Sequence, residues 1–126
     1  MKTFIKSKLR EEIDAMQATT QDGSINTIID GERNIGFIVE PNKYVRDIIK
    51  QYHLKVIRVP SHPNNTYIIY KPESETEANE LLAIAEKYGG YLSVHATKKD
   101  SFRIGQLLGY KESDIYDYIN RTGNYK

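Results

Sequence analysis

The sequence predicts an α+β fold, a mostly antiparallel sheet of four to five strands with helices on one face. The first observation is residues 54–71, where two runs rich in β-branched and aromatic residues flank a loop with two prolines and two asparagines. Such runs are typical of a strand hairpin. The second is the order across 33–95, which is strand, helix, strand, strand, helix and short strand. This is the βαββαβ order of ferredoxin-like folds, and a helical pair follows it.

An N-terminal amphipathic helix is expected at 1–18, ahead of a single α+β domain at 19–126. Residues 2–17 place apolar side chains at near-helical spacing, with charged residues between them. Because this helix lies outside the βαββαβ frame, we expect it to pack on its own domain or across a homodimer interface. The first dozen residues resemble the opening of some bacteriophage-encoded proteins, and this resemblance implies no function.

Two strands are expected next, at 24–29 and 33–39. The dipeptide Asp30-Gly31 between them favours a hairpin turn, because both residues tolerate positive φ. In the ferredoxin-like order, however, the strand at 33–39 already lies between the third and fourth strands. Either residues 91–95 are not in the sheet, or the first hairpin separates from it.

A helix is expected from about 41 to 52, with Pro41 at its first position. The central hairpin follows, with strands at 54–59 and 66–71. Both strands place apolar side chains on both faces, which is typical of strands with little exposed surface.

The second half of the chain carries clear helix signals. A capping box of the S-x-x-E form at 74–77 predicts a helix that begins at its second residue, and Gly89-Gly90 should end it. Thr97 should cap a further helix that stops at Gly109. The last helix is expected at about 112–120.

Composition excludes several classes of function. The formal net charge of +1 over 126 residues supplies no global attraction to nucleic acid or to an anionic membrane, so such binding needs a local patch. The absence of cysteine excludes disulfides, a thiol nucleophile and thiolate metal sites. No apolar run approaches the roughly 18 residues of a membrane span. The N-terminus lacks the apolar core of a signal peptide, so we expect a cytoplasmic protein without membrane association.

Motifs for catalysis and cofactor binding are also missing from the sequence. His53, His62 and His95 are far apart in the chain and form no metal-binding motif, so no metal site is expected. There is no nucleophile elbow, phosphate-binding loop or dinucleotide fingerprint, so no cofactor is expected. His62 lies in a turn-rich segment and is expected at an exposed loop tip, where it is a candidate ligand-binding residue.

The sharpest candidate site is the entry into the helix after Thr97. Unpaired N–H groups and the helix dipole attract anions to such a terminus. Thr97 adds a hydroxyl, Lys98 and Lys99 add charge, and Arg103 adds a bidentate fork. His95, just before the helix, is the candidate general acid or base beside such an anion.

The leading hypothesis is a small binding or regulatory module that acts through protein contacts or captures a small anionic, phosphate-bearing ligand. One alternative is a small enzyme that acts on a phosphate ester or nucleotide with His95 as general acid/base. The other is a nucleic-acid-binding protein, because ten tyrosines are available as stacking platforms. The third hypothesis is disfavoured, since neither strand pattern matches an RNA-binding motif.

Overall fold

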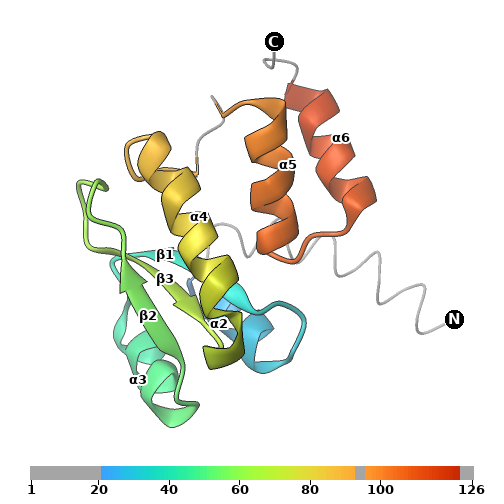
Figure 1. The fold of residues 1–126 in the computed structure, drawn as a ribbon. Helices are drawn as coiled ribbons and strands as arrows, with labels where there is room; N and C mark the ends of the chain where they lie inside the picture. The colour runs from blue at the N-terminus through green and yellow to red at the C-terminus, as the bar shows by residue number, and fades with distance from the viewer. Residues whose placement is uncertain (1–20, 93–95, 123–126) are drawn as a thin grey trace, which may run out of the picture.

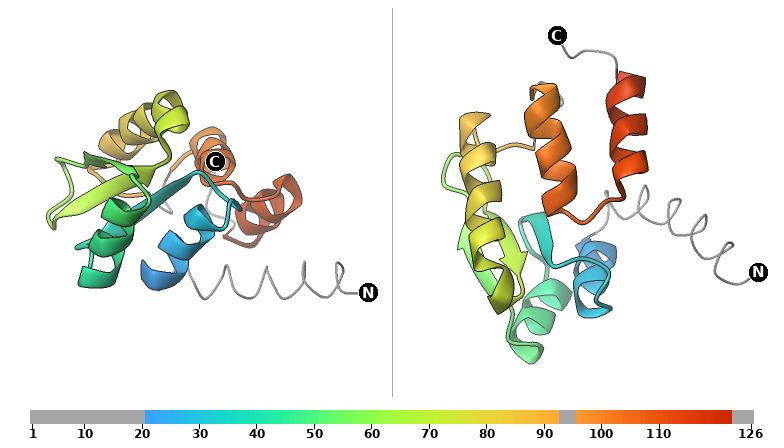
Figure 2. Two further views of the ribbon diagram at one scale, coloured as in Figure 1. Left: turned by 90° about the horizontal axis from the view of Figure 1, so that it is seen from below. Right: turned by 45° about the vertical axis from the view of Figure 1, so that its right-hand side comes forward.

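The computed structural model describes residues 21–92 and 96–122, in which a sheet lies between two groups of helices (Figures 1 and 2). The α+β class is therefore confirmed. The predicted helix at 1–18, with its place at a dimer interface, lies outside the described residues. Most of the predicted strand at 91–95 does too, and its first two residues are not in a strand. Within the described residues the sheet has three strands, so four to five strands are not confirmed.

The strands are β1 (Ile35–Val39), β2 (Lys55–Arg58) and β3 (Thr66–Tyr70), in the order β1-β3-β2. Both outer strands pair antiparallel with β3, and the register sets Ile68 between Phe37 and Ile57. The predicted central hairpin is thus confirmed. β3 is largely buried, but β2 is mostly exposed because it is an edge strand. The expectation of little exposed surface therefore holds for β3 and is wrong for β2.

The helices are α2 (Gln21–Ile29), α3 (Lys43–Gln51), α4 (Glu75–Lys87), α5 (Lys98–Leu107) and α6 (Glu112–Thr122). α2 and α3 pack on one face of the sheet and α4 on the other, with α5 beside α4 and α6 against α5 (Figure 2). Alternate residues of β3 explain this arrangement, because Ile69 packs with α2 and α3 whereas Ile68 packs with α4.

The prediction of helices on one face is therefore wrong. An apolar strand such as β3 needs cover on both sides. The ferredoxin-like core is not confirmed either, because α3 and α4 lie on opposite faces and the described residues supply three strands.

Residues 24–29 belong to α2 and are not a strand, contrary to the prediction. The segment is rich in β-branched residues, which suggested a strand, but Ile25 and Ile28 lie three residues apart and are both fully buried. That spacing puts both side chains on one face of a helix, against the sheet. Burial of this face outweighs the weak local preference for a strand.

Asp30-Gly31 ends this helix and does not form a hairpin turn. Gly31 has φ 81°, and its N–H donates to the carbonyl of Ile28 at 3.1 Å. The N–H of Glu32 donates to the carbonyl of Thr27 at 3.0 Å, which completes a Schellman motif. The conflict over the edges of β1 disappears, because no strand precedes it among the described residues.

The sequence predicted where the helices begin better than it predicted which residues cap them. The side chain of Asn42 caps α3 by accepting the N–H of Val45 at 2.9 Å, so Pro41 precedes the cap and is not the first helical residue. α4 begins at Glu75 as predicted, but Ser74 makes no side-chain cap hydrogen bond. Its φ of −104° and ψ of 22° differ from the extended geometry of a cap, because a short 3-10 turn leads into the helix.

Candidate functional site

Thr97 caps α5 as predicted, and its hydroxyl accepts the N–H of Asp100 at 3.1 Å. The carboxylate of Asp100 accepts hydrogen bonds from Lys87 at 2.8 Å and from the hydroxyl of Tyr88 at 2.6 Å. The N–H of Thr97 donates to the same Tyr88 oxygen at 3.1 Å. We call these four residues the Asp100 cluster. It joins the end of α4 to the start of α5.

The carboxylate of Asp100 lies at the start of α5, where the sequence predicted that an anionic ligand would bind. The pKa of the Asp100 carboxyl is held below its usual value, chiefly by the hydrogen bond from Lys87 and then by that from Tyr88, while burial acts in the opposite direction. The hydrogen bond to Asp100 in turn raises the pKa of Lys87. The carboxylate is therefore ionised at neutral pH and satisfies the positive end of the helix dipole.

Arg103, whose guanidinium group was predicted to bind an anionic ligand, instead pairs with a carboxylate of the protein itself. Its Nε and Nη2 donate to the two carboxylate oxygens of Glu80 on α4, at 2.5 and 2.7 Å. The hydrogen bond from Arg103 holds the pKa of the Glu80 carboxyl below its usual value. Lys98 and Lys99 remain exposed at the helix start. The assignment of Thr97, Lys98, Lys99 and Arg103 to ligand binding stays a prediction, and it now depends on the two lysines.

The two candidate histidines have different outcomes. His95 lies outside the described residues, so its role stays a prediction. His62 is only 7% exposed, so the expected exposed loop tip is wrong. Its Nδ1 accepts the N–H of Asn64 at 3.0 Å, and its ring lies 4.5 Å from that of Tyr91. The loop folds against Gly90, where a Cβ would lie 2.3 Å from the backbone nitrogen of His62.

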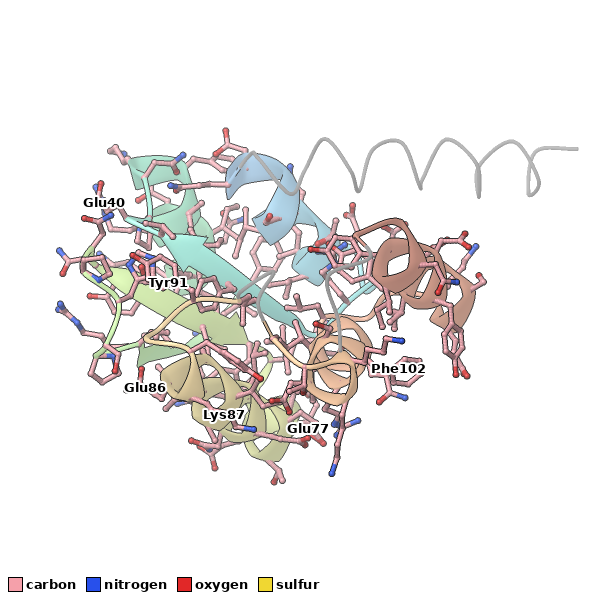
Figure 3. All side chains as sticks on the ribbon, turned by 90° about the horizontal axis from the view of Figure 1, so that it is seen from above. Glu40, Glu77, Glu86, Lys87, Tyr91 and Phe102 are labelled. Atoms are coloured by element: carbon pink, nitrogen blue, oxygen red, sulfur yellow. The ribbon has the colours of Figure 1, made fainter. Side chains whose placement is uncertain are left out.

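Another surface concentrates positive charge among the described residues. Residues 43–58, which contain α3 and β2, carry five lysines and arginines and one aspartate, a net charge of +4. Residues 72–87, which lead into and form α4, carry five glutamates and one lysine. Figure 3 shows Glu77 and Glu86 on α4, across the sheet from α3. These two segments therefore carry opposite net charge in a chain whose overall charge is near zero.

A groove of about 600 Å³ lies on the basic side, between α3 and β2. It is lined by Glu40, Pro41, Arg46, Ile49, Lys50, Val56, Asn65 and Tyr67, and we call it the α3–β2 groove. Val56 is 46% exposed at the groove. Arg58 projects on the same side of β2 as Val56, because the two are two residues apart in a strand.

The cations beside this groove are mostly without internal carboxylate partners. Among the described residues, ion pairs join Lys43 to Asp47, Lys87 to Asp100 and Arg103 to Glu80. No carboxylate of the described part of the chain lies within ion-pair distance of the remaining basic side chains here, Arg46, Lys50, Lys55 and Arg58. One Nη of Arg46 donates to the carbonyl of Pro41 at 2.6 Å.

The carboxyl of Asp47 lies in the same positive field. The pKa of its carboxyl is lowered chiefly by the hydrogen bond from Lys43, and further by the charges of Lys43, Lys50 and Arg46, while burial acts in the opposite direction. An anion placed on this surface would feel the same attraction.

This surface was not among the predicted sites, although the sequence contains a signal for it. Lys43, Arg46 and Lys50 recur at i, i+3 and i+7, so they lie along one side of a helix. Lys55 and Arg58 follow in an edge strand. The signal was missed because nothing in the sequence shows which basic residues are paired in the fold and which are not.

Comparisons with known proteins give no family. No protein-family model matches the chain, and searches of curated proteins and of solved structures found no significant match. Within residues 21–92 and 96–122, no helix has the length and apolar character to cross a membrane. The same residues contain no group of three or more histidine, aspartate or glutamate side chains arranged to hold a metal ion.

Proposed function

We propose that this protein is a small binding or regulatory module that captures an anionic partner in the α3–β2 groove. The observation that carries the proposal is a groove whose lining combines apolar side chains with cations that have few carboxylate partners among the described residues. Paired charges such as Arg103 and Glu80 contribute to the fold, whereas unpaired ones are available to a ligand. The expectation of a cytoplasmic location belongs to the same proposal.

The groove suits binding better than catalysis. Its lining includes the apolar side chains of Ile49, Val56 and Tyr67 and the cations Arg46 and Lys50. None of its lining residues is a histidine, serine or threonine, and Glu40 is its one carboxylate. The enzyme alternative depends on His95, outside the described residues, and stays a prediction.

Nucleic acid is the second candidate for the anionic partner. Because the net charge of the chain is only +1, nucleic-acid binding requires a local basic patch, and residues 43–58 supply one. Tyr44 and Tyr52, at the two ends of α3, are exposed among these cations and are available for base stacking.

The experiment compares two charge-reversed variants of the full chain. Binding of fluorescein-labelled poly-L-glutamate and of labelled oligothymidylate is followed by fluorescence anisotropy. Lys50→Glu with Arg58→Glu should weaken binding by at least about tenfold, or ~1.4 kcal/mol, because each lost surface attraction is replaced by repulsion. Wild-type binding should also weaken as salt rises.

The matched control is Lys98→Glu with Lys99→Glu, which makes the same change of charge at the exposed start of α5. Binding by this control should stay within about twofold of wild type, since poly-L-glutamate and oligothymidylate would contact the other face. If the control loses binding and the α3–β2 variant keeps it, the site at α5 is correct and the present proposal is wrong.

A further inference from the structure

We infer that the partner is an acidic polypeptide segment that binds in extended form and adds a strand to the outer edge of β2. This inference rests on the proposed function, because it names the ligand of the same groove. It joins two features of one place, the unpaired edge of the sheet and the basic, apolar groove beside it.

The edge of β2 presents backbone groups suited to another strand. No described strand pairs with β2 on its outer side. The N–H of Val59 donates to the carbonyl of Thr66 at 2.8 Å, so Val59 belongs to a hydrogen-bonded pair with β3. In an antiparallel ladder such pairs alternate with pairs whose N–H and C=O groups point away. The outward groups therefore belong to Val56 and Arg58.

The groove determines which side chains the added strand carries. Alternate side chains of a strand along β2 project toward α3, on the side of Val56. An apolar side chain at the centre would contact Val56 and Ile49. Carboxylates two residues before and after it would approach Lys50 and Arg58, cations without a carboxylate partner in the described part of the chain.

Charge and backbone chemistry also distinguish between the partners that could bind along the outer edge of β2. Two β2 strands paired antiparallel through their outward residues could place Arg58 opposite Arg58 or opposite Val56 of the other copy. Either register brings two strands together that each carry Lys55 and Arg58, and like charges brought together in this way are destabilising. Self-pairing is therefore disfavoured. A phosphate backbone offers no strand-like donors to the open carbonyls of β2. An acidic polypeptide can donate its backbone N–H groups to these carbonyls and place its carboxylates beside the cations.

The test titrates the ¹⁵N-labelled full chain with the capped peptide Thr-Glu-Thr-Val-Thr-Glu-Thr and follows amide shifts and hydrogen exchange. Strand addition predicts slower exchange at the N–H groups of Val56 and Arg58. Arg58→Glu should weaken binding by about tenfold, and Lys99→Glu, the matched control at α5, by less than about twofold. A peptide with lysine in place of both glutamates should not bind.

Backbone methylation separates strand addition from simple charge attraction. Two further peptides carry one N-methyl group, at the valine or at the following threonine. Since alternate amides of an added strand face β2, one of these peptides should lose binding and the other should retain it. Equal binding of both methylated peptides would overturn strand addition.

The two proposals fail in different ways. If oligothymidylate binds and shifts the amides of α3 and β2 while the acidic peptide does not bind, the polypeptide inference is wrong and the groove remains an anion site. If neither probe shifts these amides at low salt, both proposals are wrong.

Discussion

The start of α5 and the α3–β2 groove both gather basic side chains, but they differ in what those side chains contact. At α5, Arg103 is held by Glu80 and Lys87 by Asp100, contacts that connect α4 to α5, while Lys98 and Lys99 stay exposed. At the groove, Lys50 and Arg58 have no carboxylate partner among the described residues. The difference suggests that substitutions in the first region should change stability, and substitutions in the second should change binding.

The largest effect on stability is expected from Gly90→Ala, where the loop that contains His62 packs against Gly90. Gly90 has φ 91°, and an added Cβ would lie 2.3 Å from the backbone nitrogen of His62. Strain and the forced displacement of the loop should together cost about 3 kcal/mol or more in the free energy of unfolding. Gly89→Ala is the control, because Gly89 has φ 74° but its Cβ would meet nothing within 4 Å, and we expect about 1–2 kcal/mol. Equal losses in urea unfolding would show that the loop is not packed against Gly90.

Asp100→Asn should cost about 1–3 kcal/mol, because it removes a charged acceptor from Lys87 and Tyr88. The native pKa of Asp100 lies below the ordinary value of 3.8, so its contribution is complete above that value and disappears as pH falls through the native pKa. The stability difference between wild type and variant should therefore shrink below about pH 4. A difference that stays constant from pH 7 to the acid transition would show that Asp100 is not the charged centre of the cluster.

Thr97→Ala should cost about 1 kcal/mol through loss of the α5 cap, and the thermal midpoint should fall accordingly. Ser74→Ala is its natural comparison, because the sequence assigns a cap to both residues but the side chain of Ser74 forms no cap hydrogen bond. We expect a change within about 0.5 kcal/mol for Ser74→Ala. A loss at Ser74 as large as that at Thr97 would contradict the geometry of α4.

Arg103→Ala should have a small effect, about 0.5–1 kcal/mol in unfolding, since the side chains of Arg103 and Glu80 are each 40% exposed and solvent weakens their pairing. It should leave the binding of poly-L-glutamate and oligothymidylate unchanged. A loss of about tenfold in anion binding, with stability unchanged, would instead show that Arg103 binds the anionic ligand.

Local signals predicted local structure. The hairpin, the cap at Thr97 and the stop at Gly89-Gly90 depend on residues close together in the chain, and all three are confirmed. The segment at 24–29 was assigned wrongly because its β-branched residues favour a strand, while its burial against the sheet, a long-range effect, favours a helix.

The candidate site was less predictable for the same reason. Glu80 and Arg103 are 23 residues apart, so nothing local shows that they pair. The burial of His62 depends on contact with Gly90 and Tyr91 from another part of the chain. Conversely, Lys50 and Arg58 are exposed and have no such partners among the described residues, which only the fold reveals.

The central claim is that an anionic partner binds at the α3–β2 groove and not at the start of α5. It is tested most directly by mapping amide shifts of the ¹⁵N-labelled full chain as poly-L-glutamate is added at low and then at high salt. We expect the largest shifts within residues 46–58 and at Tyr67, reversed by salt, with the amides of residues 97–103 nearly unchanged. The largest shifts at 97–103, with none in α3 or β2, would contradict the claim.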